Sequence, residues 1–152
     1  MLYLVIVFII ILFDQYTKIL ANDSLAEIDT FPLIDNVFHF TLVKNKGAAF
    51  GIMQNQRWFF IIITFAVILA MIIYVFKYKP KHKLLLTSLS MIIGGAVGNL
   101  IDRIKLGYVI DFFDFRLINF AVFNVADSFV VIGTILLSYY LLFIYKEPKE
   151  EE

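Results

Sequence analysis

Long hydrophobic segments separated by short polar ones dominate the pattern of residues along the chain. Residues 58–76, 84–101 and 128–145 contain no Asp, Glu, Lys or Arg, and each approaches the roughly 20 apolar residues that a helix needs to cross a bilayer. The first segment is apolar up to Phe13 and then contains Asp14 and Lys18. Taken together, the segments predict four membrane-spanning helices, at residues 2–21, 58–76, 84–101 and 124–145.

The first segment is interpreted as a span rather than as a cleaved signal peptide. It has no basic region before the hydrophobic stretch and no cleavage signature of small residues, and both are expected in a signal peptide. Asp14 would also lie badly within the hydrophobic part of a signal peptide. We therefore expect this segment to remain in the protein.

The connector at residues 77–83 orients the bundle, because four of its seven residues are lysines. The positive-inside rule makes this short loop cytoplasmic, and four spans then place both termini in the cytoplasm. The two opposite connectors, residues 22–57 and 102–123, together contain as many basic residues as the loop and the C-terminal tail. The basic residues of the two long connectors are spread over far more residues than those of the loop and tail. The higher density of positive charge in the loop and tail therefore favours the same orientation.

The two outer connectors contain short segments typical of strands. Residues 37–43, 108–115 and 118–123 are rich in β-branched and aromatic residues, which are enriched in strands. We expect a small β-structure on the extracytoplasmic face, and the strand at 37–43 could pair with an extended peptide. The predicted fold is an all-α membrane core of four helices with a small extracytoplasmic β-cradle, in one domain of residues 1–152.

Composition supports the membrane class and excludes others. The chain is 61% hydrophobic and 17% charged, against about 45–50% and about 25% in soluble domains. Its 13 basic and 13 acidic residues balance, which argues against a nucleic-acid partner. Cysteine is absent, and His39 and His82 are expected on opposite sides of the membrane. We therefore expect neither a disulfide nor a metal site.

Polar residues within the spans are candidates for function, because ionisable groups there are unfavourable. Asp14 and Lys18 are four residues apart and share a helix face, as an ion pair or as part of a substrate site. Asn99 and Arg103 have the same spacing, and Arg103 could contact a lipid phosphate or pair with a carboxylate. The glycines between residues 94 and 98 are interpreted mainly as helix-packing positions.

The start of the last span offers a cap and a candidate catalytic group. Asn124 is a favourable N-cap, and Asp127 three residues later resembles a capping box. Asp127 could also form a close carboxylate pair, in which one member keeps its proton near neutral pH and the other activates a water. The residues alone leave Asp111 and Asp114 open as its partner.

Five blocks of residues together resemble the bacterial lipoprotein signal peptidase family, also called signal peptidase II. They occur in the family's order and cover nearly the whole chain. The blocks are Asp14–Lys18, Asn45–Gly51, Gly94–Arg103, Val109–Phe112 and Phe123–Asp127.

The resemblance implies an intramembrane aspartic endopeptidase without a cofactor. Its substrate would be a diacylglyceryl-modified prolipoprotein, cut just before the lipidated cysteine by Asp111 and Asp127. The enzyme would be a monomer in contact with membrane lipid, in the bacterial plasma (inner) membrane, with its active site at the extracytoplasmic face. The family's supporting and substrate-binding residues map onto Asp14, Lys18, Asn45, Gly47, Asn99, Arg103, Asn124 and Ala126.

Two other functions are considered. A small four-span transporter could couple protons to its substrate through Asp14. A membrane assembly factor would use the glycines for helix contacts and would need no paired aspartates. The long outer connectors and the acids at the outer ends of the spans argue against both.

Overall fold

The computed structural model describes residues 2–48 and 51–145 of the 152-residue chain. Its helices are α1 (Leu2–Leu25), α2 (Arg57–Tyr78), α3 (Lys83–Lys105) and α4 (Val125–Tyr139), and α4 continues as a π-helical turn, Tyr140–Ile144. The strands are β1 (Thr30–Ile34), β2 (Phe38–Asn45) and β3 (Val109–Asp114), followed by a 3₁₀ turn, Arg116–Ile118.

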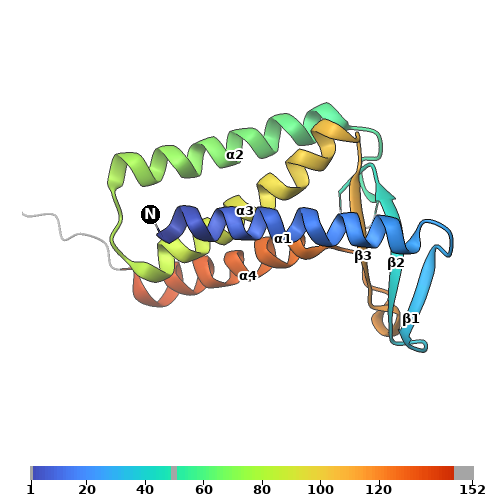
Figure 1. Ribbon diagram of the computed structural model, residues 1–152. Coiled ribbons are helices and arrows are strands. Elements are labelled where there is room, and N and C mark those ends of the chain that lie inside the picture. Colours follow the sequence, from blue (N-terminus) through green and yellow to red (C-terminus); the bar gives the residue numbers. More distant parts are fainter. Residues whose placement is uncertain (1, 49–50, 146–152) are drawn as a thin grey trace, which may run out of the picture.

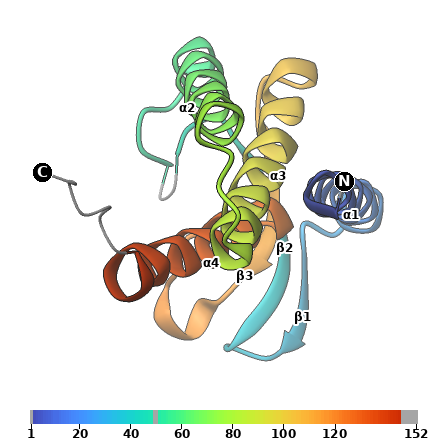
Figure 2. The same ribbon diagram turned by 90° about the vertical axis from the view of Figure 1, so that its left-hand side faces the viewer.

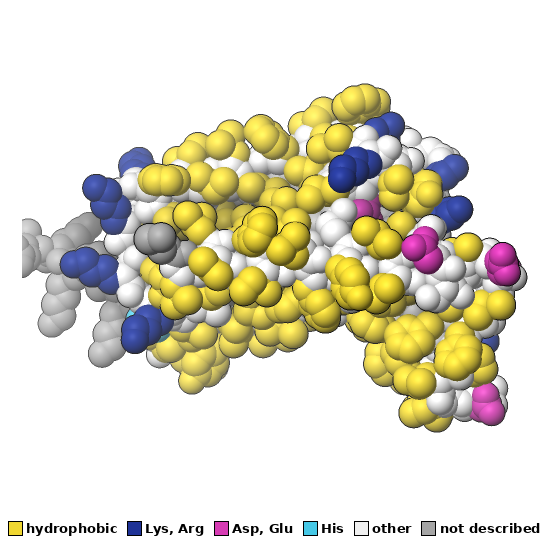
Figure 3. Space-filling view, in the orientation of Figure 1, with side chains coloured by type: hydrophobic (Ala, Val, Ile, Leu, Met, Phe, Trp, Pro, Cys, Tyr) yellow, Lys and Arg dark blue, Asp and Glu magenta, His cyan; other side chains and the backbone are white. Residues whose placement is uncertain are grey.

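Four helices of the described chain are long and apolar enough to cross a membrane. They form a bundle in which the start of α1, the α2–α3 loop and the end of α4 lie at one end and the strands at the other (Figures 1 and 2). Hydrophobic side chains cover most of the face of this bundle that Figure 3 shows. The protein is a multi-pass membrane protein with a small sheet at one end of the helical bundle, as predicted.

Two helices extend further than the hydrophobic pattern predicts. α1 continues to Leu25 and α3 to Lys105, about one turn past the expected ends at residues 21 and 101. Leu25 is buried under the sheet, and the additional residues of α3 include the buried Asp102. The pattern marks where the apolar segment ends, whereas contacts with the sheet decide where the helix ends.

Glycines of α3 bring its neighbours close, as predicted. A Cβ atom at Gly98 would lie 2.5 Å from Asp14 Oδ2, and one at Gly95 would lie 2.3 Å from the carbonyl oxygen of Ala126. A larger residue at Gly95 would push against the backbone of α4, and one at Gly98 would displace the Asp14 carboxylate from its partners. These contacts let polar groups of α1, α3 and α4 reach one another across the bundle.

The three strands form an antiparallel sheet in the order β1-β2-β3. The expected strands at 37–43 and 108–115 are confirmed, but the one at 118–123 is wrong. Its place is taken by the 3₁₀ turn, a left-handed Asn119 and an isolated bridge between Phe123 and Phe113. The sequence also did not indicate β1. Because β1 and β3 flank β2 on both sides, the expectation that this strand pairs with a substrate peptide is wrong too.

A small apolar cluster joins the sheet to the bundle. Ala21 and Leu25 of α1 pack against Ile110 and Phe112 of β3 and Val125 of α4. All five residues are at most 8% exposed. The cluster fixes β3 over the end of α1 and the start of α4, where the polar residues of the spans also lie.

Candidate active site

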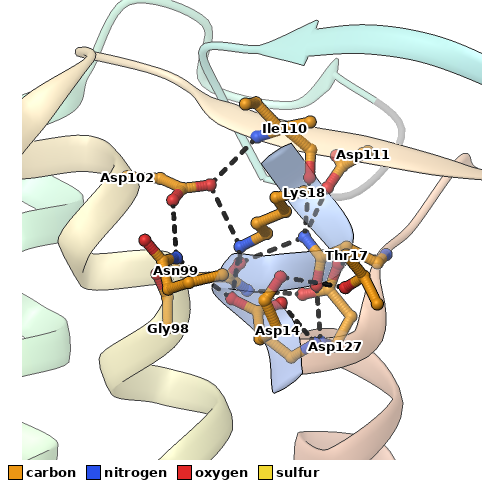
Figure 4. Close-up of polar contacts among 12 residues, drawn as sticks. Asp14, Thr17, Lys18, Gly98, Asn99, Asp102, Ile110, Asp111 and Asp127 are labelled. Carbon is orange, nitrogen blue, oxygen red and sulfur yellow. Dashed lines mark hydrogen bonds and ion pairs between the residues drawn. The ribbon is translucent and has the colours of Figure 1, made fainter. Parts of the chain in front are cut away.

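Asp14 and Lys18 form a buried ion pair together with Asp102. Lys18 Nζ lies 2.9 Å from Asp14 Oδ2 and 3.0 Å from Asp102 Oδ2, and the three residues are at most 3% exposed. Asp14 Oδ1 also accepts a 2.9 Å hydrogen bond from the backbone N–H of Ala126. Because each charged group has several partners, these contacts offset the free-energy cost of burying it. The group joins α1, α3 and α4 (Figure 4).

Lys18 also orients two asparagine amides. Its Nζ donates to Asn99 Oδ1 over 2.9 Å, and the same oxygen accepts a bond from Asn124 Nδ2 over 3.1 Å. With its oxygen engaged, Asn99 directs Nδ2 at Asp127 Oδ1, 2.7 Å away. The Asn124 amide also donates to Asp111 Oδ1 over 2.6 Å. Lys18 thereby supports the donors that face both aspartates.

The capping box predicted at the start of α4 is confirmed. The backbone N–H of Asp127 donates to Asn124 Oδ1 over 2.9 Å, and the backbone N–H of Asn124 donates to Asp127 Oδ2 over 3.2 Å. The cap fixes the side chain of Asp127 at the start of α4. Asn124 therefore both caps α4 and contacts the two aspartates.

Asp111 and Asp127 line one cavity of about 450 Å³. Asp111 is 2% exposed, whereas Asp127 is half-buried. Residues 120–123 and 130–132 provide a largely apolar wall. A concave, mainly apolar site with a few converging polar groups is the usual form of a ligand site. Its polar lining residues are Asn45, Asn99, Arg103, Asp111, Asp127 and Ser128.

The surroundings of Asp111 favour its protonated form. Burial, followed by the charge of Asp127, raises the pKa of Asp111 to about 7, although hydrogen bonds from Asn45 and Asn124 act in the opposite direction. The Asn45 amide donates to Asp111 Oδ2 over 3.0 Å. Near neutral pH a large share of molecules therefore carries a proton on this carboxyl, which is suitable for a general acid.

The segment after β2 is held to α3 by hydrogen bonds. The backbone N–H of Gly47 donates to Asn45 Oδ1 over 2.9 Å, and Arg103 Nη2 donates to the Gly47 carbonyl over 3.1 Å. Arg103 thus binds a backbone carbonyl, a contact that neither sequence-based interpretation included. Arg57 at the start of α2 donates to the carbonyls of Arg103 and Ile104, over 2.7 Å each. Residues 49 and 50 of the second block lie outside the described residues.

Asp114, the other candidate partner of Asp127, belongs to a different polar group. It accepts bonds from Thr41 Oγ1 over 2.7 Å and from Arg116 Nε over 2.9 Å, and it does not line the cavity of Asp111. Although burial acts to raise its pKa, the bonds from Arg116 and Thr41 lower the pKa of Asp114 below its usual value. The structure brings Asp111, and not Asp114, into the cavity with Asp127.

Sequence reasoning missed two members of the polar network, Gln15 and Asp102. Gln15 Nε2 donates to Asp102 Oδ1 over 2.9 Å, and Asp102 Oδ2 accepts the backbone N–H of Ile110 over 3.1 Å. Gln15 directly follows Asp14 and Asp102 directly precedes Arg103, so both residues lie within the quoted blocks. The helical spacing of Asp102 from Asn99 could have indicated a shared face.

The histidines do not contribute to this network. His39 lies in β2, and His82 lies at the start of α3, at the opposite end of the bundle (Figure 1). Among residues 2–48 and 51–145, no group of three or more His, Cys, Asp and Glu side chains could hold a metal ion. The polar groups available in the cavity are carboxylates, amides, a guanidinium and a hydroxyl.

A family model described as signal peptidase (SPase) II matches residues 6–143. The chain belongs to this family. Membership makes it a peptidase, and the family's class is aspartic. The family gives no support to the proton-coupled transporter.

Relatives and solved structures agree with the family. The lipoprotein signal peptidase of Caldanaerobacter subterraneus subsp. tengcongensis is 50% identical over 92% of this chain and 95% of its own. That of Clostridioides difficile is 47% identical over 98% of this chain and 100% of its own. A bacterial membrane enzyme structure solved by the in meso method at 2.3 Å has a TM-score of 0.83 and 32% identity, covering 99% of this chain and 93% of that one.

Proposed function

We propose that the chain is an intramembrane aspartic endopeptidase that removes the signal peptide from diacylglyceryl-modified prolipoproteins, just before the lipidated cysteine. One observation carries the proposal: Asp111 and Asp127 come from β3 and α4 but line the same cavity. Asn124 contacts both of them. Two carboxylates in one partly buried site provide an acid and a base for peptide hydrolysis.

The environments of the two aspartates support different roles. Asp111, with its raised pKa, would keep a proton and donate it as a hydrogen bond to the carbonyl under attack. Asp127 accepts two bonds, from the Asn99 amide and the Asn124 backbone, which hold its carboxyl in place at the start of α4. Asp127 would take a proton from the attacking water, and Asp111 would deliver its proton to the leaving nitrogen.

The remaining predicted residues would hold this pair in place. Asp14 and Lys18 do not line the cavity, and their contacts suit support of the asparagines rather than contact with substrate. Ala126 contacts Asp14 through its backbone and leaves room for α3 through its small side chain. Gly47 and Arg103 would hold the end of β2, which carries Asn45, at one side of the cavity.

The position of the cavity suits a lipid-anchored peptide. It lies where the outer ends of α3 and α4 meet β3, and its apolar wall belongs to α4 and to residues 120–123. A diacylglyceryl group in the outer leaflet would hold the scissile bond at this depth. We propose that the enzyme works as a single domain and as a monomer in the plasma membrane, with no cofactor.

Cleavage of a diacylglyceryl-modified prolipoprotein by the full chain in liposomes tests the proposal. Asp111→Asn and Asp127→Asn should each abolish cleavage while the protein stays folded. Asp114→Asn is the matched control and should retain most activity, because Asp114 lies outside the cavity. Full activity of either single variant, or loss of activity in the control alone, would refute the assignment. Unmodified prolipoprotein in the same assay tests the lipid requirement.

Labelling of single cysteines tests the proposed orientation, because the natural chain contains none. Lys79→Cys lies in the lysine-rich loop and Leu33→Cys lies in β1 at the other end of the bundle. In cells whose cell wall or outer membrane has been removed but whose plasma membrane is intact, a membrane-impermeant maleimide should label the Leu33→Cys variant and not the Lys79→Cys variant. Labelling of Lys79→Cys under these conditions would place the termini outside.

A further inference from the structure

We propose that Asp102 is a positioning residue that sets the place of Asp111 by holding the backbone of the residue before it. The proposal rests on the proposed role of Asp111 in peptide hydrolysis. Asp102 is 3% exposed and does not line the cavity. Its effect on the reaction must therefore pass through the residues that it contacts.

Asp102 joins three elements with two oxygen atoms. Oδ2 contacts Lys18 Nζ at 3.0 Å and accepts the backbone N–H of Ile110 at 3.1 Å. Oδ1 accepts a bond of 2.9 Å from Gln15 Nε2. α1 thus supplies two donors, β3 supplies one, and α3 supplies the acceptor (Figure 4). Charged acceptors form shorter and stronger hydrogen bonds than neutral ones.

The contact at Ile110 matters because of where it falls on β3. Two residues further along, the backbone N–H groups of Phe112 and Phe113 bond to the carbonyl of Phe123. Pairing with β2 is irregular between the positions opposite Phe113 and Asp111. Asp111 itself pairs with Val43 of β2 and Ile110 pairs with Lys44, but the Ile110 N–H bonds to Asp102. Asp102 therefore adds a fixed point one residue before Asp111, next to the place where the pairing becomes irregular.

Loss of this contact would leave a buried donor without its acceptor. Ile110 is 7% exposed, and an unpaired buried N–H is unfavourable enough to displace the local backbone. A shift of Asp111 by about 1 Å relative to Asp127 would be enough to lower the turnover rate about 100-fold. Substrate binding would change little, because Asp102 is not part of the cavity wall.

Two substitutions separate positioning from general stability. Asp102→Ala removes both acceptor oxygens, whereas Asp102→Asn retains one oxygen that can accept the Ile110 N–H. The matched control is Ser90→Ala, since Ser90 is also a buried polar residue of α3 and bonds to the carbonyl of Leu86 in its own helix. Each variant is studied as the full chain in detergent micelles or liposomes.

Two measurements test the proposal on these variants: cleavage kinetics and hydrogen exchange of the backbone amides of β3. In Asp102→Ala, we expect kcat to fall about 100-fold with KM changed less than about threefold. Exchange at Ile110 should accelerate while Phe112 and Phe113 stay protected. Asp102→Asn should recover at least about a tenth of the kcat and much of the Ile110 protection, and Ser90→Ala should match the natural protein.

Several results would overturn the proposal. Unchanged kcat in Asp102→Ala would show that Asp111 does not need this contact. Equal loss in Asp102→Asn and Asp102→Ala, or loss of protection throughout β3, would show a structural role alone. If Asp102→Ala does not fold, the Asp102→Asn variant decides by whether kcat and Ile110 exchange change together. Failure of the natural protein to cleave would refute the proposed function instead, and Ile110 exchange would still test the contact.

Discussion

The natural protein should lose more stability between pH 5 and pH 8 than the Asp111→Asn variant does. This holds even though the substitution abolishes the proposed activity. The pKa of Asp111 is raised from 3.8 to about 7 by burial and by Asp127. A folded state that holds a proton more tightly than the unfolded state loses stability as pH rises between these two values. Asn has no proton to lose and is free of this dependence.

The size of the effect follows from the shift. Roughly three pH units at about 1.4 kcal/mol each give a full penalty of about 4 kcal/mol, of which about 2.5 kcal/mol develops between pH 5 and pH 8. Asp111 is 2% exposed, so solvent screening does not reduce the effect much. For a chain of this length, that energy corresponds to a change in Tm of about 5–10 °C.

Thermal unfolding of both proteins in the same detergent at pH 5 and pH 8 measures the difference. The Tm of the natural protein should fall by about 5–10 °C more than that of Asp111→Asn over this range. Asp114→Asn is the matched control, because the pKa of Asp114 is lowered and its stabilisation is lost only as pH falls below the usual carboxyl range. Equal pH dependence in the natural protein and Asp111→Asn would refute the reasoning.

Three further outcomes are expected. Cleavage by the natural protein should decline as pH rises above about 7, because Asp111 then loses its proton; a rate that is constant from pH 6 to pH 9 would contradict its role as the acid. Asn124→Ala should lower kcat about 100-fold and stability by about 1–2 kcal/mol, since it removes a helix cap and the donor to Asp111; kinetics and calorimetry measure both. Gly98→Ala should lower stability by about 1–3 kcal/mol, because the new Cβ would lie 2.5 Å from Asp14 Oδ2; an unchanged Tm would show that the Asp14 carboxylate can move aside without cost.

The membrane core could be predicted from the sequence because the bilayer imposes a simple rule on it. A span needs a long apolar segment, and charged residues mark its ends. The sheet was harder to predict because its strands are short and are held by neighbours far away in the chain. β1 contains Pro32 and is mostly exposed, so it carries neither a clear alternation nor a hydrophobic run.

The site could be predicted in part for a different reason. Spacing indicated that Asp14 and Lys18 share a face and that Asn124 and Asp127 form a cap, because both depend on local helix geometry. The choice between Asp111 and Asp114 depends on how β3 packs against α4, which spacing does not determine. Asp102 was missed because its partners come from α1 and β3.

The edge of β3 beside Asp111 is closed by side chains, which limits how an inhibitor could be designed. The Ile110 N–H is bonded to Asp102, and its carbonyl accepts a bond from the Asn124 amide over 3.3 Å. A peptide mimic that extended the sheet at this residue would have to displace both bonds. Compounds that fill the cavity and leave the Ile110 backbone untouched avoid that competition, so cavity shape and the two carboxyls are the better starting points if the proposed active site is correct.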